Sequence, residues 1–173
     1  IAQVPGVSAV RSILYASNIV ETGTSSSFSY IVGVKPESRL GGPWAMADGS
    51  AAPGSGEAVV PEILARKGGV KLDDSITILG RRFRVTGLSR ETFSLANSVT
   101  FISFDAMQDL LASPGVFSYL LVKAQPGVSP EILAERIAAT VPGVTALTTA
   151  EFAANDRALV QQMGVDVIRI MST

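Results

Sequence analysis

Cysteine and histidine are both absent from the 173-residue sequence. Without cysteine the chain has no disulfides and no thiolate zinc sites, and without histidine it has no imidazole general base. Charged residues make up only 17% of the chain and the formal net charge is −1, so there is no electrostatic basis for binding nucleic acid. We therefore predict no catalytic residues, no cofactor-binding residues and no metal ligands.

Long hydrophobic runs are missing as well. No segment approaches the ~20 consecutive apolar residues that span a bilayer. No signal peptide is visible, and the chain begins at Ile1 rather than at methionine, so we expect an excised fragment of a longer protein. Apolar residues nevertheless make up 47% of the chain, which is enough to bury a core in one domain or in two small lobes.

The clearest local pattern begins at residue 57. Residues 57–60 form an apolar run that stops at Pro61, and proline suits the first turn of a helix. The following residues, 63–67, place Ile63, Leu64 and Lys67 on one side of a short helix. Gly68 and Gly69 then end it, as glycine does at a left-handed C-terminal cap. The stretch predicts a short strand followed directly by a short helix.

A hairpin is predicted next, because residues 75–79 and 82–88 alternate with period two. Gly80-Arg81 between them fits a type II′ turn with glycine first. One face of the hairpin is apolar, and the other carries arginines directed towards water. The apolar face holds Ile76, Ile78, Phe83 and Val85; Arg82 and Arg84 lie on the opposite face.

The other elements follow from alternation, capping residues and breakers. An antiparallel pair is expected first, then a long surface loop that contains Trp44, and later a capping box at Asp105 with Gln108. The predicted strands are residues 10–19, 28–34, 98–103, 117–123 and 144–148, and the strand 117–123 is expected to be central in its sheet. The predicted helices begin near residues 105, 130 and 150. Residues 35–55 are the predicted loop.

The order of the pieces from 56 to 88 resembles the extracytoplasmic domain of MacB-like ABC transporter permeases, the group that includes the FtsX and lipoprotein-release permeases. The matching pieces are 57–60, 63–70, 74–78, Gly80 and 83–87, with weaker matches at 5–7, 32–34 and 99–111. One departure is Asp73, which stands where the family usually has glycine, so we expect that turn to differ.

The resemblance implies an α+β fold with two lobes. A porter-like α/β sandwich lobe would join residues 1–34 to 116–173, and residues 35–115 would form an inserted β-rich lobe. It also implies a non-enzymatic domain on the periplasmic side of the bacterial inner membrane, held there by flanking membrane helices. ATP hydrolysis would take place in a separate nucleotide-binding subunit or domain. The permease would pass the resulting motion to its periplasmic part by mechanotransmission, for example in efflux.

Implied partners are a second permease copy, that nucleotide-binding subunit, and a periplasmic adaptor or a transported lipoprotein, peptide or lipid-like compound. The alternative is a stand-alone periplasmic binding module or a small β-barrel enzyme. Membrane helices directly before Ile1 and after Thr173 in the parent sequence would favour the permease.

Two sets of residues are candidates for contacts. Trp44 could anchor a partner or pack as a lid over the domain's own core, and Arg81, Arg82 and Arg84 could meet an acidic partner or simply form a solvated hairpin face. In the final helix, predicted over 150–163, Phe152, Leu159 and Met163 recur at helical spacing. That helix either packs on its own domain or acts as a coupling stem to a second membrane span.

Overall fold

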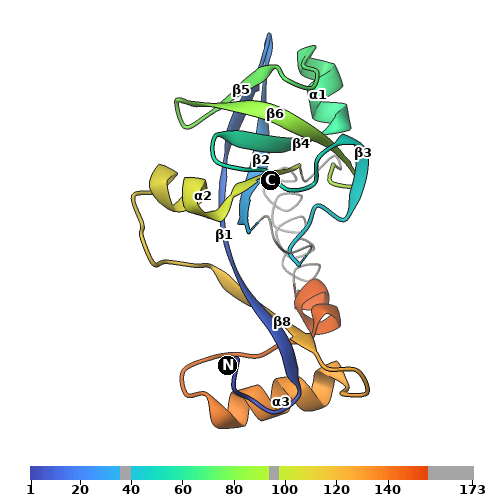
Figure 1. The fold of residues 1–173 in the computed structure, drawn as a ribbon, viewed down its shortest axis with the longest axis vertical. Coiled ribbons are helices and arrows are strands. Elements are labelled where there is room, and N and C mark those ends of the chain that lie inside the picture. Colours follow the sequence, from blue (N-terminus) through green and yellow to red (C-terminus); the bar gives the residue numbers. More distant parts are fainter. Residues whose placement is uncertain (36–39, 94–97, 156–173) are drawn as a thin grey trace, which may run out of the picture. The chain divides into compact units, whose positions relative to one another are not determined.

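The computed structural model describes residues 1–35, 40–93 and 98–155 (Figure 1). The chain divides into two compact units, one formed by Ile1–Val10 with Val122–Thr173 and the other by Arg11–Leu121. Two strands, β1 (Val7–Thr22) and β8 (Tyr119–Ala124), contribute residues to both units. The division into a porter-like lobe and an inserted lobe at residues 34/35 and 115/116 stays a prediction.

In the unit Arg11–Leu121 the main strands form a closed ring. The hydrogen-bonded order is β2-β7-β4-β6-β5-β1, and β1 also pairs with β2. The pairs β2–β7 and β4–β6 are parallel, whereas β1 is antiparallel to both of its neighbours in the ring. The bounds are β2 Ser25–Val34, β4 Glu57–Pro61, β5 Ser75–Ile78, β6 Arg81–Arg90 and β7 Val99–Ser103. This mixed sheet with helices confirms the predicted α+β class.

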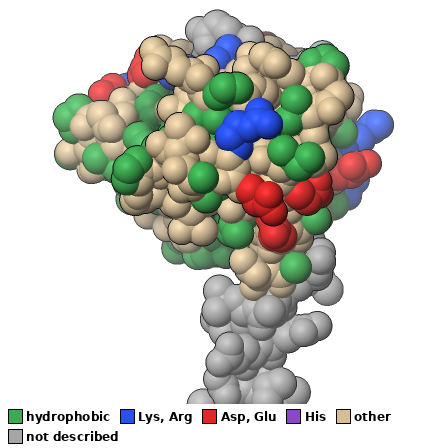
Figure 2. Space-filling model, turned by 90° about the horizontal axis from the view of Figure 1, so that it is seen from below, with side chains coloured by type: hydrophobic (Ala, Val, Ile, Leu, Met, Phe, Trp, Pro, Cys, Tyr) green, Lys and Arg blue, Asp and Glu red, His purple; other side chains and the backbone are tan. Residues whose placement is uncertain are grey.

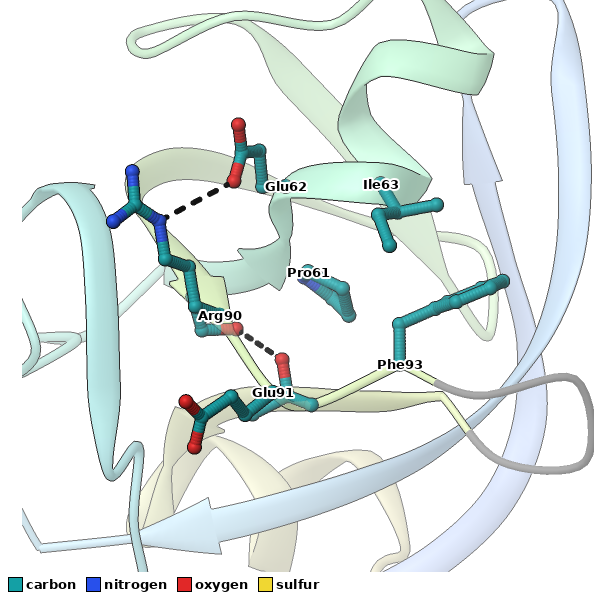
Figure 3. A pocket seen from close by; sticks show the side chains of 8 residues that line it. Pro61, Glu62, Ile63, Arg90, Glu91 and Phe93 are labelled. Atoms are coloured by element: carbon teal, nitrogen blue, oxygen red, sulfur yellow. Dashed lines mark hydrogen bonds and ion pairs between the residues drawn. The ribbon is translucent and has the colours of Figure 1, made fainter.

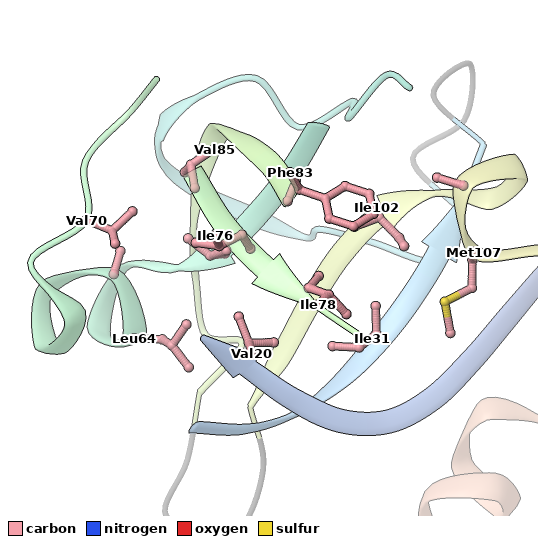
Figure 4. Packing of buried hydrophobic residues seen from close by; sticks show 14 of the residues in the cluster. Val20, Ile31, Leu64, Val70, Ile76, Ile78, Phe83, Val85, Ile102 and Met107 are labelled. Atoms are coloured by element: carbon pink, nitrogen blue, oxygen red, sulfur yellow. The ribbon is translucent and has the colours of Figure 1, made fainter. Parts of the chain in front are cut away.

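The main hydrophobic core lies inside this ring, where each strand contributes its alternate side chains (Figure 4). Two short helices complete it, α1 (Glu62–Gly68) through Leu64 and α2 (Phe104–Leu110) through Met107. Figure 4 shows these two side chains on opposite sides of the labelled core. Among the side chains that are almost fully buried are Val20, Ile31, Leu64, Ile76, Ile78, Phe83, Val85, Ile102 and Met107.

Two glycines allow the helices to lie directly on the strands. A Cβ on Gly68, the last residue of α1, would lie 2.1 Å from Oγ1 of Thr22 in β1. A Cβ on Gly33 in β2 would lie 2.6 Å from Cβ of Met107 in α2. Both distances are far below van der Waals contact, so any larger residue would push a helix off the ring. Gly69 then ends α1 with φ of +67°, as predicted.

The hairpin β5–β6 has the predicted facing but a different turn. Ile76 pairs with Phe83 across the ladder and both are buried, while Arg82 and Arg84 are exposed. The turn residues are Leu79 and Gly80, with φ of +51° and +75°. Two consecutive positive φ values define type I′ rather than the expected type II′ turn, and its twist matches that of the flanking strands.

Four other expectations are corrected. Residues 35–55 are not all loop, because β3 (Ala45–Gly49) pairs with β6, and residues 36–39 lie outside the described ranges.

The side chain that caps α2 is Ser103, not Asp105: its Oγ accepts from Ala106 N at 3.3 Å. Residues 144–148 form no strand. β8 lies at the end of the strand order instead of in its centre, since its described neighbour is β1.

The unit that joins the chain ends is built on one helix, α3 (Pro130–Thr140). It begins where the sequence predicts a helix start, near residue 130. Ser129 caps it, its Oγ accepting from Ile132 N at 3.2 Å, and Pro130 occupies its first turn. Leu133 and Ile137 are buried against Val4, so the first residues are packed rather than frayed. A further helical segment begins at residue 149 and is described as far as residue 155.

We predict that Phe83→Ala lowers the free energy of unfolding by about 3–5 kcal/mol. Phe83 is 1% exposed, and its loss would leave a cavity at the centre of the ring of strands. Urea denaturation of the chain measures this. The matched control is Phe28→Ala in β2. Phe28 is 54% exposed, so its replacement should change the free energy of unfolding by no more than about 0.5 kcal/mol. Equal losses for the two variants would show that the interior has been assigned to the wrong face of the sheet.

Candidate interaction surfaces

The three arginines of the β5–β6 hairpin do not form one free cationic patch. Arg81 Nη1 lies 3.9 Å from Oδ2 of Asp109 in α2, and its guanidinium lies 5.8 Å from the Phe83 ring centroid. Arg84 is held between two carboxylates. Within the described ranges, Arg82 alone of the three has no ion pair, so it is the one whose charge is fully presented to solvent.

Arg84 joins three separate parts of the chain. Its Nη2 donates to Oε1 of Glu57 at 2.5 Å, and its Nη1 donates to Oδ1 of Asp73 at 2.8 Å. Glu57 begins β4 and is the direct neighbour of Arg84 in the parallel β4–β6 ladder. Hydrogen bonds from the guanidinium, first to Asp73 and then to Glu57, raise the pKa of Arg84. The arginine therefore ties the β4 strand and the turn before β5 to one point on β6.

The turn that contains Asp73 keeps a glycine-type backbone. Asp73 has φ of +70°, the left-handed conformation that glycine adopts most easily and that aspartate tolerates better than most residues. Its N–H donates to Val85 O at 2.8 Å, while Asp74 Oδ2 accepts from Lys71 N at 2.8 Å. The two neighbouring carboxylates thus have separate structural roles. The departure from glycine changes the side chain, which now reaches Arg84, and leaves a backbone conformation that glycine could also adopt.

Trp44 lies just before β3 and is 68% exposed. Its ring meets the Phe101 ring edge-on, with centroids 6.1 Å apart. Phe101, Val34 and Val59 form a small second cluster on the outside of the ring of strands. Trp44 therefore rests with one edge on that cluster and presents most of its surface outward, and its role as a partner contact stays a prediction.

A shallow pocket of about 90 Å³ lies where α1 begins and β6 ends. Figure 3 shows Ile63 and Phe93 on one side, and Glu62 with Arg90 on the other, where Arg90 Nε lies 3.6 Å from Glu62 Oε2. Ligand sites for drug-sized molecules measure roughly 300–1,000 Å³, so this hollow has room for a few waters or one small side chain.

The C-terminal helical segment starts at a capping box. Thr148 Oγ1 accepts from Glu151 N at 3.2 Å, and Glu151 Oε2 accepts from Thr148 N at 2.7 Å. Phe152, one of the predicted coupling residues, lies on this segment and is 47% exposed. Leu159 and Met163, the other two, lie outside the described residues.

The described surface shows no dominant charge. In Figure 2 acidic and basic side chains lie near one another among apolar and neutral ones, on the face seen there. The described ranges contain no group of three or more acidic, histidine or cysteine side chains that could hold a metal ion. Nor do they contain a helix with the length and hydrophobicity that crossing a membrane requires.

The sequence matches the MacB-like periplasmic core domain over residues 1–140. The chain belongs to this family. No curated protein sequence matches it.

Solved structures show the same fold. The extracellular domain of the noncanonic ABC-type transporter YknZ from Gram-positive bacteria superimposes with a TM-score of 0.63 and 15% identity, over 77% of this chain and 73% of that one. The periplasmic region of MacB from Actinobacillus actinomycetemcomitans gives a TM-score of 0.61 and 14% identity, over 80% and 69%. Family and fold together indicate a periplasmic domain of a MacB-like ABC transporter permease.

Sequence reasoning missed the partners of Arg84 in this MacB-like core domain. Glu57 and Arg84 are neighbours only because β4 and β6 pair in parallel, with 26 residues between the two positions in the sequence. Alternation along each strand gives the facing of a side chain but not which strand lies beside it. The one available signal was the acidic residue at the start of the β4 run, on which the family resemblance partly rests.

We predict that Arg84→Gln increases amide hydrogen exchange at Asp73 and Asp74, because the turn loses its link to β6. The effect should shrink at high salt, since exposed ion pairs are screened. Arg82→Gln is the matched control, as it removes the same charge from the same face without breaking an ion pair within the described ranges. Identical exchange in the two variants would mean that Arg84 does not hold the turn.

Proposed function

We propose that this MacB-like core domain is the non-catalytic, extracytoplasmic part of an ABC transporter permease at the bacterial inner membrane. A separate nucleotide-binding subunit or domain would hydrolyse ATP in the cytoplasm, and this domain would convert the resulting motion into export or the handling of a lipoprotein, peptide or lipid. A second permease copy and a periplasmic adaptor are the expected partners. The family match over residues 1–140 is the observation that carries this proposal.

The capped helix after Thr148 supports a role in transmitting motion. A helix passes on rotation or displacement only if its first turn is fixed to the body that moves it. Here both the side chain and the backbone of Thr148 bind Glu151, so two of the otherwise unpaired donors at the helix start are satisfied. The carboxylate of Glu151 also lies in the first turn, where the helix dipole favours negative charge.

The capping box gives the helix start a defined response to acid. Hydrogen bonds from the backbone and the hydroxyl of Thr148 lower the pKa of Glu151 from its usual 4.5. Because the folded-state pKa is the lower one, the stabilisation is complete above pH 4.5 and is lost as pH falls through the folded value. The protection factor of the Thr148 amide, which is its intrinsic exchange rate at each pH divided by the observed rate, should therefore fall below that pH in the wild type. In Glu151→Gln the protection factor should be lower at neutral pH and should not change through this pH range. An unchanged step would exclude Glu151 as its source.

We predict that Thr148→Ala loosens the helix start at a cost of about 1 kcal/mol and lowers the transport achieved per ATP hydrolysed. The measurement uses the full permease reconstituted with its nucleotide-binding subunit. Ser129→Ala is the matched control, because it removes an equivalent cap from α3 in the same unit at a similar cost.

A lower ratio in Thr148→Ala with a normal ratio in Ser129→Ala supports transmission through the C-terminal helix. Equal ratios in both variants and in the wild type, with the cap shown to be lost, would contradict it. In that case the helix would complete the fold without coupling the two activities.

A further inference from the structure

Leucine stands at an unfavourable position in the turn between β5 and β6. The two turn residues, Leu79 and Gly80, both have positive φ, and type I′ turns favour Asn, Asp or Gly there because other side chains are strained in that conformation. Leu79 is also 46% exposed, and it is not one of the described residues that pack in or against the hydrophobic clusters. Neither the turn nor the packing of the described chain explains an apolar side chain at this place.

A positive charge accompanies this leucine at the end of the hairpin. Arg82 follows three residues after Leu79 and is exposed, and it makes no ion pair within the described part of the chain. A Cβ added to Gly80 would meet no atom within 4 Å, so the space beside the turn is open. The tip of the hairpin, defined here as residues 79–82, therefore presents an apolar side chain next to an unshared cation.

The pocket between α1 and the end of β6 has the size of this apolar side chain. Its volume is about 90 Å³. An apolar cavity of about 150 Å³ holds one benzene molecule, which has six carbon atoms. In the same proportion, the pocket accommodates the four carbon atoms of a leucine side chain.

The lining of the pocket also suits an apolar group. Pro61, Ile63 and Phe93 supply apolar walls (Figure 3). Ser89 and Thr92, which line it as well, are buried, and their hydroxyls are hydrogen-bonded to each other at 2.6 Å. Because these hydroxyls satisfy each other, an apolar side chain can replace water in the pocket without leaving them unpaired.

Glu91 places a negative charge beside the pocket. The other acidic residue of the lining, Glu62, already faces Arg90 at 3.6 Å, whereas Glu91 is exposed and has no ion pair in the described ranges. Figure 3 shows Pro61 between Ile63 and Glu91, so the apolar wall and the free carboxylate lie on two sides of one residue. The pocket is thus complementary to an apolar side chain that arrives together with a cation.

The tip and the pocket lie at opposite ends of the same strand. β6 has ten residues, from Arg81 to Arg90, and spans about 30 Å. A chain therefore cannot place its own tip in its own pocket, but a second copy can supply the tip. A protrusion and a matching pocket at different places on one molecule give a head-to-tail contact, in which each copy uses a different surface.

We propose that Leu79 of one copy of this chain enters the pocket between α1 and β6 of a second copy, with Arg82 of the first copy paired to Glu91 of the second. One side chain and its rim bury far less than the about 800 Å² per partner of a stable interface, so isolated chains should pair weakly. Only the high local concentration rests on the proposed function, since permeases held in one membrane would meet often.

Two single-cysteine chains test this contact directly, because the chain has no other thiol. A short bis-maleimide should link concentrated Arg82→Cys chains to Glu91→Cys chains, and should link neither chain to itself at a similar rate, since equal positions in neighbouring copies lie about 30 Å apart. The matched control replaces Glu91→Cys by Asp105→Cys. Asp105 is also an exposed acid, but its helix α2 lies at the tip end of β6, where Asp109 faces Arg81.

Leu79→Asn separates docking from folding. Asparagine tolerates positive φ better than leucine, so this variant should keep or raise the melting temperature. Placed in the Arg82→Cys chain, it should slow the linkage to Glu91→Cys about tenfold or more, because the apolar burial is lost. Placed in the Glu91→Cys chain, whose tip takes no part in that linkage, it should leave the rate unchanged. Ile63→Ser, which removes a wall of the pocket, should slow the linkage only in the Glu91→Cys chain.

Charge exchange tests the ion pair without any cysteine. Arg82→Glu and Glu91→Arg should each weaken the self-association of concentrated chains, measured by sedimentation, because each brings like charges together. An equal mixture of the two variants should regain it, since every tip then finds a pocket of opposite charge. Failure of the mixture to recover would overturn the pairing of Arg82 with Glu91.

Equal linkage of Arg82→Cys to Glu91→Cys and to Asp105→Cys, or an unchanged rate with Leu79→Asn in the Arg82→Cys chain, would overturn the proposal. No linkage in any mixture would also overturn it and leave the tip to a partner of another kind. These results are independent of the transport ratio predicted for Thr148→Ala, so the contact between copies can fail while the proposed transporter function stands, and the reverse.

Discussion

The fold depends on the double pairing of β1. Near its end this strand bonds to β2 on one side and β5 on the other: Val20 pairs with both Ser27 and Ile78. This closes the ring of strands and creates an interior in which side chains from all six strands can meet. At the same end of β1, α1 lies so close to the strand that a Cβ at position 68 would meet Thr22, and Gly68 has none. The hairpin, both short helices and the hydrophobic core depend on that one closure.

Local patterns in the sequence predicted the elements whose signals are local. The alternation around Phe83 gave the facing of the hairpin, and the capping and breaker residues near position 130 gave the start of α3. Each of these depends on side chains within a few positions of one another. The order of strand, helix and hairpin in residues 56–88 also carried the resemblance to the family, which the family match confirmed.

Features set by distant parts of the chain were not predictable in this way. β3 has the sequence Ala-Met-Ala-Asp-Gly, with few strand-forming residues, and it is a strand because the free edge of β6 lies beside it. Residues 144–148 have the opposite mismatch, with strand-like composition but no neighbour to pair with in the described structure. The link from Arg84 to Glu57 and Asp73 was hidden for the same reason.

The central claim is that this MacB-like domain moves in response to ATP hydrolysed elsewhere. Because the chain lacks cysteine, Phe152→Cys gives one half-exposed reporter in the first turns of the C-terminal helix. The most direct test is its maleimide labelling rate in the reconstituted permease, with the nucleotide-binding subunit empty and then trapped with ATP. The account predicts different labelling rates in the empty and the ATP-trapped state. Identical rates in the two states, in a permease preparation shown to be active in transport, would contradict it.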